Sequence, residues 1–336
     1  MNILVAFNPE ADSFSTFFNE DVKKKLAQMG NVYFFSKKPT EELIAEKIKG
    51  ADVLITGWGT PQISGKILKN ADKLRYILHT GGSVASIITD EVYDKNITVL
   101  SGNEIFAHSV AEGVIAYILS ALRHIPRIEE ALRCKGEWES LDTPYNHNRS
   151  LIGKTVGIVS FGAISRYLIP MLAAFGTKIK LYTRKDISKD YLEKYNIVKT
   201  DLNDIFKTCD IVSIQTAYNP NTENMINKSH LSLLKDGALF VNTARSRIVN
   251  TADLISELKT KRISAVLDVF DNEPLESESP FIKMENVFLM PHMAGPTVDM
   301  RAHITKSLID CIKNCEAGEE VIYKIGREHA KEMSVH

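Results

Sequence analysis

Residues 155–165 read TVGIVSFGAIS, an apolar run followed by a turn of small residues and the start of a helical run. In dinucleotide-binding proteins such a strand, turn and helix place the first helical amides against a pyrophosphate. The usual spacing is GxGxxG, and the three glycine positions here hold Ser160, Gly162 and Ser165. The glycine that allows close approach to phosphate is kept, whereas Ser160 stands where glycine normally permits the tight turn. The stretch predicts an α/β sheet that binds a dinucleotide.

Similar apolar runs alternate with charged helical stretches along the chain, which is typical of βαβ units. A first series of strands is predicted at residues 1–7, 31–36, 52–57 and 74–80, with helices at 20–30 and 39–50. A second series is predicted at residues 155–162, 178–183, 210–216, 237–244, 263–270 and 286–291. The fold class is therefore α/β with two doubly wound parallel sheets.

Two long helices are predicted beside the second series. Residues 104–124 place apolar side chains at helical spacing, with Asn103 as the N-cap. Residues 297–317 do the same with Met300, Ile304, Leu308 and Ile312. The first helix connects the two series of strands.

Composition narrows the class of protein. With 336 residues, 44% of them hydrophobic, the chain is long enough for two cores, and its formal net charge of −1 argues against a nucleic-acid partner. Residues 1–14 read as a first strand rather than a signal peptide, and we expect no membrane span and a cytoplasmic location. The four cysteines lack CxxC spacing and are predicted to be free, buried thiols; no metal site is expected.

Three polar residues follow three of the predicted strands: Arg245, Glu273 and His292. Ligands of open α/β sheets bind outside the carboxyl ends of the strands, so this placement favours a site over three structural side chains. Reduction of a 2-oxo acid requires a cation for the carboxylate and carbonyl and a proton donor for the oxygen. A histidine beside a carboxylate is such a donor. The set indicates hydride-transfer chemistry on a 2-oxo or 2-hydroxy acid.

The motifs around these residues are NTAR at 242–245, LDVFDNEP at 267–274 and PHMAGPT at 291–297. In this order they resemble the D-isomer-specific 2-hydroxyacid dehydrogenase family, and the resemblance runs through most of the chain. It implies that Arg245 binds substrate, that His292 is the acid/base in contact with substrate, and that Glu273 supports His292. It also implies that Asp268 orients the nicotinamide carboxamide; the alternative is a strand-end aspartate that caps a turn.

The cofactor site predicted from the turn and the resemblance has twelve residues. They are Ser160, Phe161, Gly162, Ala163, Ile164, Ser165, Thr183, Arg184, Lys185, Thr243, Ala244 and Asp268. After the strand at 178–183, an NAD enzyme usually offers an acidic side chain to the ribose, and this chain offers Thr183, Arg184 and Lys185 instead. NADP is therefore favoured. Asp186 lies close enough to leave NAD open.

The resemblance further implies a domain arrangement. Residues 1–101 and 298–336 would form a flavodoxin-like substrate domain, and residues 102–297 an inserted Rossmann cofactor domain, with a hinge at the two crossovers. Gly81, Gly82 and Ser83 would bind substrate through backbone amides. Trp138 would pack at a homodimer interface. His79 and His108 are interpreted as structural.

The function predicted from these features is the NAD(P)-dependent reduction of a small 2-oxo acid, such as glyoxylate or hydroxypyruvate, to the D-2-hydroxy acid. Two alternatives stay open at this point. One is a phosphoglycerate dehydrogenase, and the other is a nucleotide-sensing regulatory protein without catalysis, since folds are reused.

Overall fold

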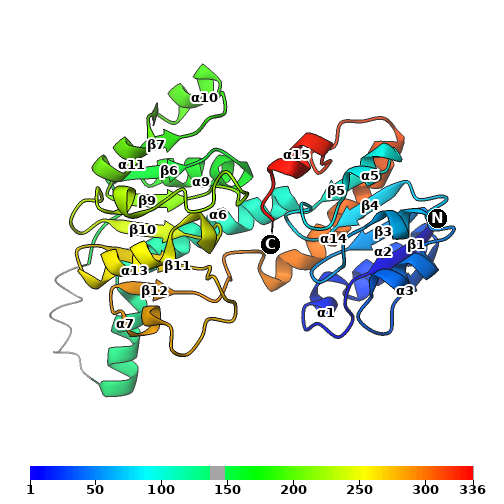
Figure 1. Ribbon diagram of the computed structural model, residues 1–336, viewed down its shortest axis with the longest axis horizontal. Helices are drawn as coiled ribbons and strands as arrows, with labels where there is room; N and C mark the ends of the chain where they lie inside the picture. Colours follow the sequence, from blue (N-terminus) through cyan, green and yellow to red (C-terminus); the bar gives the residue numbers. More distant parts are fainter. Residues whose placement is uncertain (137–147, 336) are drawn as a thin grey trace. The chain divides into compact units, whose positions relative to one another are not determined.

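The structure is a computed structural model that describes residues 1–136 and 148–335 (Figure 1). The chain divides into two compact units. Unit 1 comprises Met1–Phe106 and Pro296–His336, and unit 2 comprises Ala107–Gly295. Each is a parallel α/β sheet covered by helices, as predicted.

The sheet of unit 1 has five parallel strands in the order β2-β1-β3-β4-β5, within the described residues. This is the flavodoxin-like order. The strands are β1 (Asn2–Ala6), β2 (Asn31–Phe34), β3 (Val53–Thr56), β4 (Tyr76–His79) and β5 (Thr98–Ser101). The sequence prediction missed β5, a run of only four residues that leads into a long helix.

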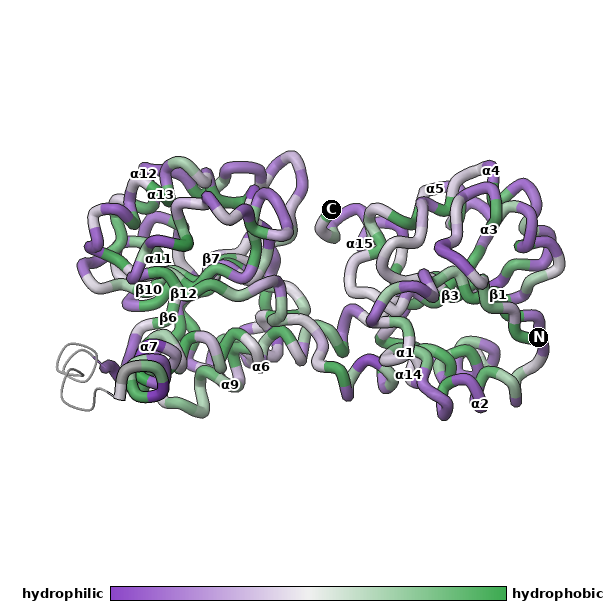
Figure 2. Tube along the Cα trace, turned by 90° about the horizontal axis from the view of Figure 1, so that it is seen from below, coloured by the Kyte–Doolittle hydropathy of each residue, from purple (hydrophilic) through white to green (hydrophobic). Residues whose placement is uncertain are grey.

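Helices cover both faces of this sheet (Figure 2). One face carries α3 (Glu41–Lys47), α4 (Gly65–Leu68) and α5 (Asp90–Asp94). The other carries α1 (Phe14–Phe17), α2 (Glu20–Met29) and α14 (Val298–Glu316). Apolar side chains from each set pack against the strands, which gives unit 1 a core on either side.

The end of the chain completes unit 1. Helix α14 begins after Thr297 and ends before Ala317, as predicted, and buries Ile304, Leu308 and Ile312. Helix α15 (Arg327–Glu332) follows, and Met333 is buried in the core. The Ser83 hydroxyl donates a hydrogen bond to the carbonyl of Ser334 at 2.6 Å. This final segment, which gave no functional signal in the sequence, thus contacts the loop after β4.

The sheet of unit 2 has the parallel order β12-β11-β10-β9-β6-β7-β8 in the part of the chain described. Its strands are β6 (Thr155–Val159), β7 (Lys178–Tyr182), β8 (Ile197–Lys199), β9 (Ile211–Ile214), β10 (Leu239–Asn242), β11 (Ser264–Leu267) and β12 (Val287–Leu289). The order reverses between β6 and β9, where dinucleotides bind in Rossmann folds. The prediction missed β8, a three-residue edge strand that buries only Ile197.

Seven helices of unit 2 lie within the described residues. They are α6 (Asn103–Leu122), α7 (Ile125–Glu130), α9 (Ala163–Ala174), α10 (Lys189–Lys194), α11 (Leu202–Thr208), α12 (Lys228–Leu231) and α13 (Thr251–Lys259). The first turn of α6 belongs to unit 1. Asn103 is the first residue of α6 rather than its N-cap, because the Ser101 hydroxyl accepts the Asn103 amide.

Helix α6 is long and apolar enough to cross a membrane by length and composition alone. Glu104 and Glu112 interrupt it, and no charge-free run of membrane length occurs in it. Ala111, Val114 and Ile118 are fully buried in the core of unit 2. Core helices of this kind pass the same test, so α6 is weak evidence for a span.

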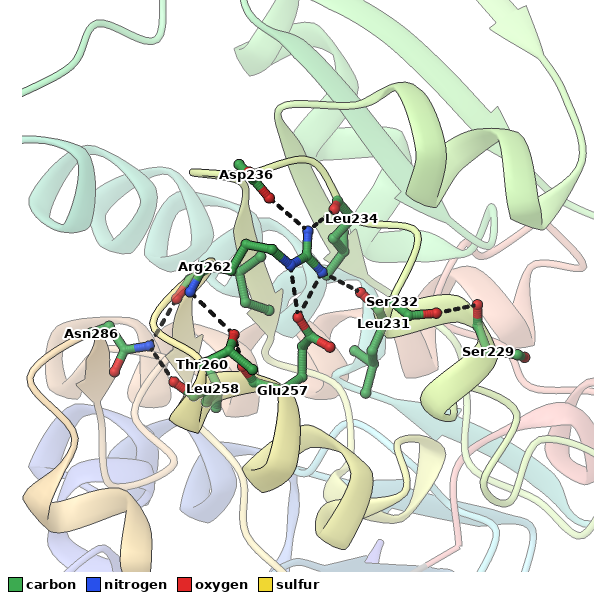
Figure 3. Close-up of polar contacts among 11 residues, drawn as sticks. Ser229, Leu231, Ser232, Leu234, Asp236, Glu257, Leu258, Thr260, Arg262 and Asn286 are labelled. Atoms are coloured by element: carbon green, nitrogen blue, oxygen red, sulfur yellow. Dashed lines mark hydrogen bonds and ion pairs between the residues drawn. The ribbon is translucent and has the colours of Figure 1, made fainter.

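A polar network holds the amino ends of β11 and β12 (Figure 3). Arg262 precedes β11 and forms hydrogen bonds to Glu257 at 2.6 and 3.1 Å, to Asp236 at 3.2 Å and to the carbonyls of Leu231 and Leu234. Asn286, before β12, donates to two further carbonyls. The network ties α12 and α13 to the sheet.

The cysteines are free, but their burial differs from the prediction. Cys209 and Cys311 are buried, Cys315 is partly buried and Cys134 is exposed. The prediction of buried thiols was wrong for Cys134, which lies in the π-helical turn Ala131–Lys135 and is exposed there, as is its neighbour Arg133. Burial raises the pKa of Cys209 and of Cys311 to about 11.

Candidate active site

The predicted catalytic residues follow three neighbouring strands at one edge of the unit 2 sheet. Arg245 comes three residues after β10, Glu273 follows β11, and His292 follows β12. Because β10, β11 and β12 are adjacent and parallel, their carboxyl ends lie side by side. The topology therefore brings the three loops to one edge.

His292 and Glu273 form a close pair. The distance from His292 Nδ1 to Glu273 Oε2 is 2.7 Å, and the other carboxylate oxygen accepts the Phe270 amide at 3.0 Å. The side chains remain 40% and 36% exposed. The φ angle of His292 is +53°, a conformation unusual for a non-glycine residue and typical of strained functional positions. The pair is thus hydrogen-bonded while the imidazole stays accessible.

Asp268 lies behind this pair and is completely buried. Its two carboxylate oxygens accept the amides of Met293 and Ala294 at 2.8 and 3.0 Å, and the Tyr117 hydroxyl lies 3.5 Å away. Burial raises the pKa of Asp268, and the two amides oppose that shift. Asp268 therefore shapes the turn that follows His292, which is the capping role weighed as the alternative.

Arg245 is partly buried in the turn after β10. Its Nη1 donates to the carbonyl of Ala244 at 2.7 Å. Asn242 closes the turn, since its side chain donates to the Arg245 carbonyl at 3.0 Å and accepts the Ala244 amide at 3.1 Å. Burial lowers the pKa of Arg245, and the charge of Glu273 opposes the shift. Asn242, a strand residue without an obvious role in the sequence, fixes the arginine.

The turn between β6 and α9 has an unusual backbone. Ser160 has a φ of +88°, in the region that favours glycine, so it adopts the conformation of the residue it replaces. Ser165 is buried and donates to the Ser160 carbonyl at 2.8 Å. Phe161 packs edge-on against Tyr191, with 5.4 Å between ring centroids. Ala163 and Ile164 form the first turn of α9.

The residues of this turn fit a dinucleotide. Gly162 is the N-cap of α9 with a φ of −110°, which any residue can adopt, and a Cβ there would meet no protein atom within 4 Å. No neighbouring protein atom therefore requires glycine at this position. A ligand that approaches the first amides of α9 would require it, because a side chain would stand in its way. Gln215, directly after β9, is buried, and its Oε1 has no partner among the described residues. Its Nε2 donates to Thr243 at 3.3 Å.

The turn after β7 carries the residues predicted to choose between NAD and NADP. Thr183 is buried, and its hydroxyl accepts the Lys185 amide at 3.0 Å. Arg184 and Lys185 are exposed. Lys199, on the missed strand β8, donates to the Lys185 carbonyl at 3.1 Å. The structure thus adds a third cation that only the pairing of β7 with β8 reveals.

The predicted substrate loop belongs to unit 1 and follows β4. The Ser101 hydroxyl lies 2.6 Å from the Gly82 carbonyl and 3.1 Å from that of Gly81. Within residues 1–136 and 148–335, nothing accepts the backbone amides of Gly81, Gly82 and Ser83. Gly81 must be glycine, because a Cβ would lie 2.3 Å from Nε2 of His79. Three consecutive amides are therefore available to an anion.

The remaining histidines have structural contacts, and one predicted contact lies outside the description. His79 is buried against the Thr56 hydroxyl at 3.0 Å. His108 stacks on Tyr167 with 4.9 Å between ring centroids. Trp138 lies outside the described residues. In the described part of the chain, no three or more His, Cys, Asp or Glu side chains are arranged to hold a metal ion.

Comparison with known proteins identifies relatives. Residues 115–294 match the model of the D-isomer specific 2-hydroxyacid dehydrogenase NAD binding domain. D-3-phosphoglycerate dehydrogenase of Methanocaldococcus jannaschii is 31% identical over 303 residues, which cover 90% of this chain and 56% of that relative. Glyoxylate reductase of Thermococcus litoralis is 31% identical over 270 residues, which cover 79% and 80%.

Among solved structures, an acyclic imino acid reductase (Bsp5) in complex with NADPH and D-Arg has a TM-score of 0.80 and 25% identity. The match covers 97% of this chain and all of the other. The family model spans more than half of the chain and includes the strands that carry the candidate site. The chain belongs to the D-isomer specific 2-hydroxyacid dehydrogenase family and is an oxidoreductase that acts on CH–OH donors with a nicotinamide cofactor.

Proposed function

We propose that this protein reduces a small 2-oxo acid of the glyoxylate or hydroxypyruvate type to the D-2-hydroxy acid. The observation that carries the proposal is the 2.7 Å contact between His292 Nδ1 and Glu273 Oε2. It orients the imidazole and leaves Nε2 to give a proton to the substrate oxygen.

Arg245 would hold the substrate carboxylate and polarise the carbonyl. Its planar guanidinium can donate two parallel hydrogen bonds to the two oxygens of a carboxylate. The partial burial of Arg245 strengthens the attraction between the two charges. The amides of Gly81, Gly82 and Ser83 would bind the carboxylate of the acid. A bound reduced nicotinamide would supply the hydride.

The cofactor would be held by the residues from Ser160 to Ser165 and by Thr243, Ala244 and Asp268. Gly162 supports this assignment, because its missing side chain leaves the first amides of α9 open. Asp268 has acceptor capacity beyond the two amides that it binds, so a carboxamide contact and its structural role are compatible.

We further propose that NADP is preferred over NAD. Thr183, Arg184 and Lys185 put a hydroxyl and two cations at the position of the adenosine ribose, and the nearest acid in the turn is Asp186. Lys199 adds a cation to the same turn. Titration of the protein with NADPH and with NADH, followed by nucleotide fluorescence, tests this. Equal affinities, or tighter NADH binding, would reject the preference.

The primary test is replacement of His292 with Asn. We expect kcat for glyoxylate to fall by roughly 10²–10⁴-fold, the usual contribution of a general acid, with the dissociation constant for NADPH changed little. Unchanged turnover would reject the assignment of His292. A panel that includes 3-phosphohydroxypyruvate separates the phosphoglycerate dehydrogenase alternative, since one curated relative carries that name.

A wild-type protein that binds nicotinamide nucleotide but turns over no acid of the panel would favour the sensing alternative. A homodimer and a cytoplasmic location stay predictions from the resemblance and the sequence. Light scattering of the purified protein and cell fractionation test them.

A further inference from the structure

Ser101 is the last residue of β5, and its side chain reaches the loop that follows β4. The two strands pair in a register that sets Ser101 beside His79, the last residue of β4. Ser101 is fully buried, and its Oγ lies 2.6 Å from the carbonyl oxygen of Gly82 and 3.1 Å from that of Gly81. The hydroxyl also accepts the Asn103 amide at 3.2 Å. One serine side chain therefore meets two consecutive carbonyl groups of the loop.

The backbone of the loop is closely packed on the side of Ser101. A Cβ on Gly102 would lie 3.2 Å from the carbonyl oxygen of Gly81, so the bare backbone of Gly102 leaves room for that carbonyl. A Cβ on Gly81 would lie 2.3 Å from Nε2 of His79. Gly81 and Gly82 are adjacent, and glycine restrains the backbone less than other residues do. The peptide planes of this pair therefore need a contact from outside the loop to fix them.

The direction of a carbonyl group determines the direction of the amide in the same peptide. A trans peptide is planar, and its C=O and N–H groups point to opposite sides. Because the Gly81 carbonyl is turned toward Ser101, the Gly82 amide points away from it. The Gly82 carbonyl is turned the same way, so the Ser83 amide also points away. Both amides lack an acceptor among the described residues, and both residues are partly exposed. The Ser101 hydroxyl thus directs two amides toward the accessible side of the loop.

The side chain of Ser83 already has partners within unit 1. Its hydroxyl donates to the Ser334 carbonyl at 2.6 Å and accepts the Ala85 amide at 3.3 Å. The donor of Ser83 that remains for a ligand is its backbone amide. An anion at this loop would therefore meet amides whose direction depends on Ser101.

We propose that Ser101 is a positioning residue for substrate binding, which orients the Gly82 and Ser83 amides toward the carboxylate of the 2-oxo acid. Ser101 does not touch the substrate and acts through the loop. The inference rests on the proposed function, because it takes this loop as the carboxylate site. Arg245 and His292 belong to unit 2 and keep their contacts when Ser101 is changed. Loss of the Ser101 hydroxyl should therefore weaken binding of the acid and leave the rate of the chemical step nearly unchanged.

The kinetic test replaces Ser101 with Ala, Cys and Thr. In Ser101→Ala both carbonyls lose their donor, and the peptide planes of the glycine pair can rotate. We expect KM for glyoxylate to rise roughly tenfold, the effect of losing about one hydrogen bond to a charged group, with kcat within about threefold of wild type. Ser101→Thr, which keeps the hydroxyl, should restore most of the affinity. Ser101→Cys, whose thiol is a weak donor of similar size, is the safer variant for folding and should give an intermediate KM. An unchanged KM in Ser101→Ala and Ser101→Cys, or a fall in kcat alone, would overturn the proposal.

Thr305→Val is the matched control. Thr305 is also buried in unit 1, on α14, and its hydroxyl lies 3.5 Å from a carbonyl of its own helix. The change removes a buried hydroxyl without touching the loop, so KM should stay within twofold of wild type even if the melting temperature falls. A KM raised as much as in Ser101→Ala would show that any loss of packing in unit 1 weakens binding of the acid, and that Ser101 has only a structural role.

A spectroscopic test keeps this inference separate from the proposed reaction. In protein isotope-labelled at glycine nitrogen, NMR gives a separate signal for each glycine amide. Gly82→Ala identifies the signal of Gly82, since a Cβ there would lie 3.5 Å from the nearest listed neighbour, the Phe106 ring, which is ordinary contact. Titration with oxamate, an unreactive analogue of a 2-oxo acid, with oxidised cofactor present, should shift the Gly82 signal saturably in wild type and in Ser101→Thr. In Ser101→Ala the shift should be smaller and should require more oxamate.

The two proposals fail in different ways in this titration. A Gly82 signal that does not respond to oxamate in the wild-type protein, or that responds equally in Ser101→Ala, would overturn the role of Ser101 even if the enzyme is active. A saturable shift that is weakened in Ser101→Ala, in a protein that turns over no acid, would uphold the role of Ser101 and reject the proposed reaction.

Discussion

The two ends of the unit 2 sheet each carry an ionic cluster, and the clusters are built differently. At the amino end, Arg262 meets Glu257, Asp236 and two carbonyls, and the Glu257 side chain is only 14% exposed (Figure 3). At the carboxyl end, Glu273 and His292 form a single contact and remain 36% and 40% exposed. The first cluster joins several parts of unit 2 through one arginine, whereas the second is a single pair of side chains that stays more accessible.

On the proposed function, the difference separates stability from chemistry within one sheet. Ligands bind at the carboxyl ends of parallel strands, so charges at the amino ends are free to serve packing alone. At the carboxyl end, the buried residue that stabilises the loop is Asp268. Its carboxylate accepts the backbone amides of Met293 and Ala294. Mutations at the two ends should therefore affect different measurements.

The largest effect is expected for Glu273→Gln. The amide would place a donor against His292 Nδ1 and disturb the contact that orients the imidazole, so we expect kcat to fall by roughly 10²-fold. The melting temperature should stay within about 2 °C, because the side chain is partly exposed. A retained kcat together with a lower melting temperature would show that the pair at the carboxyl end stabilises the fold and does not serve the reaction.

A similar but mixed effect is expected for Asp268→Asn. One carboxylate oxygen becomes an NH₂ group that faces the amide of Met293 or Ala294, and an unmet buried amide costs about 1–3 kcal/mol. Because His292 directly precedes Met293, we expect kcat to fall about tenfold and the melting temperature to drop as well. Kinetics and calorimetry on the same preparation test this. A fall in kcat without loss of stability would assign Asp268 to cofactor contact alone.

The matched change at the amino end is Glu257→Gln. It removes the charge that Arg262 meets at 2.6 Å while Asp236 and the carbonyls remain, so we expect a loss of about 1–2 kcal/mol of unfolding free energy. Denaturant unfolding measures it, and steady-state kinetics should give a kcat within twofold of wild type. A kcat lowered as much as in Glu273→Gln would show that the two ends are not independent.

The smallest effect is expected for Ser160→Gly, which should increase stability. Relief of the positive φ favours glycine by about 1–2 kcal/mol, and the greater freedom of glycine in the unfolded chain offsets about 0.4–1 kcal/mol of it. The net gain should raise the melting temperature by at most a few degrees. Ser279→Gly is the control, since Ser279 has a φ of −56° and should only lose stability. Destabilisation by Ser160→Gly would mean that the serine side chain stabilises the turn.

Sequence reasoning succeeded where residue identity carries the chemistry. The alternation of strands and helices predicted both sheets, and the placement of Arg245, Glu273 and His292 after strands put them at one edge. It failed for β5, which leads directly into the long helix α6, and for β8, an edge strand of which only Ile197 is buried. Asn103 was predicted as the N-cap of α6 but is its first helical residue. The side chain that accepts the Asn103 amide is the Ser101 hydroxyl.

Residues that act through the fold gave no signal of their own. Lys199 reaches the turn after β7 only because β8 pairs beside it, and Gln215 matters because β9 adjoins β6 at the reversal of strand order. The open amides of Gly81 to Ser83 depend on Ser101 and on backbone geometry. Such contributions depend on the pairing of strands and on the geometry of turns, and the type of a residue does not indicate either.

The contact between Ser83 and Ser334 joins positions 251 residues apart. On a ribosome, unit 2 is complete once Gly295 has emerged, whereas the loop of unit 1 lacks its last support until Ser334 has been made. Domains usually fold as units during synthesis, so the nascent chain would complete unit 2 before the loop after β4 of unit 1 gains this contact. A chain that is released early or clipped within α15 would then keep unit 2 whole and lack the hydrogen bond to Ser83.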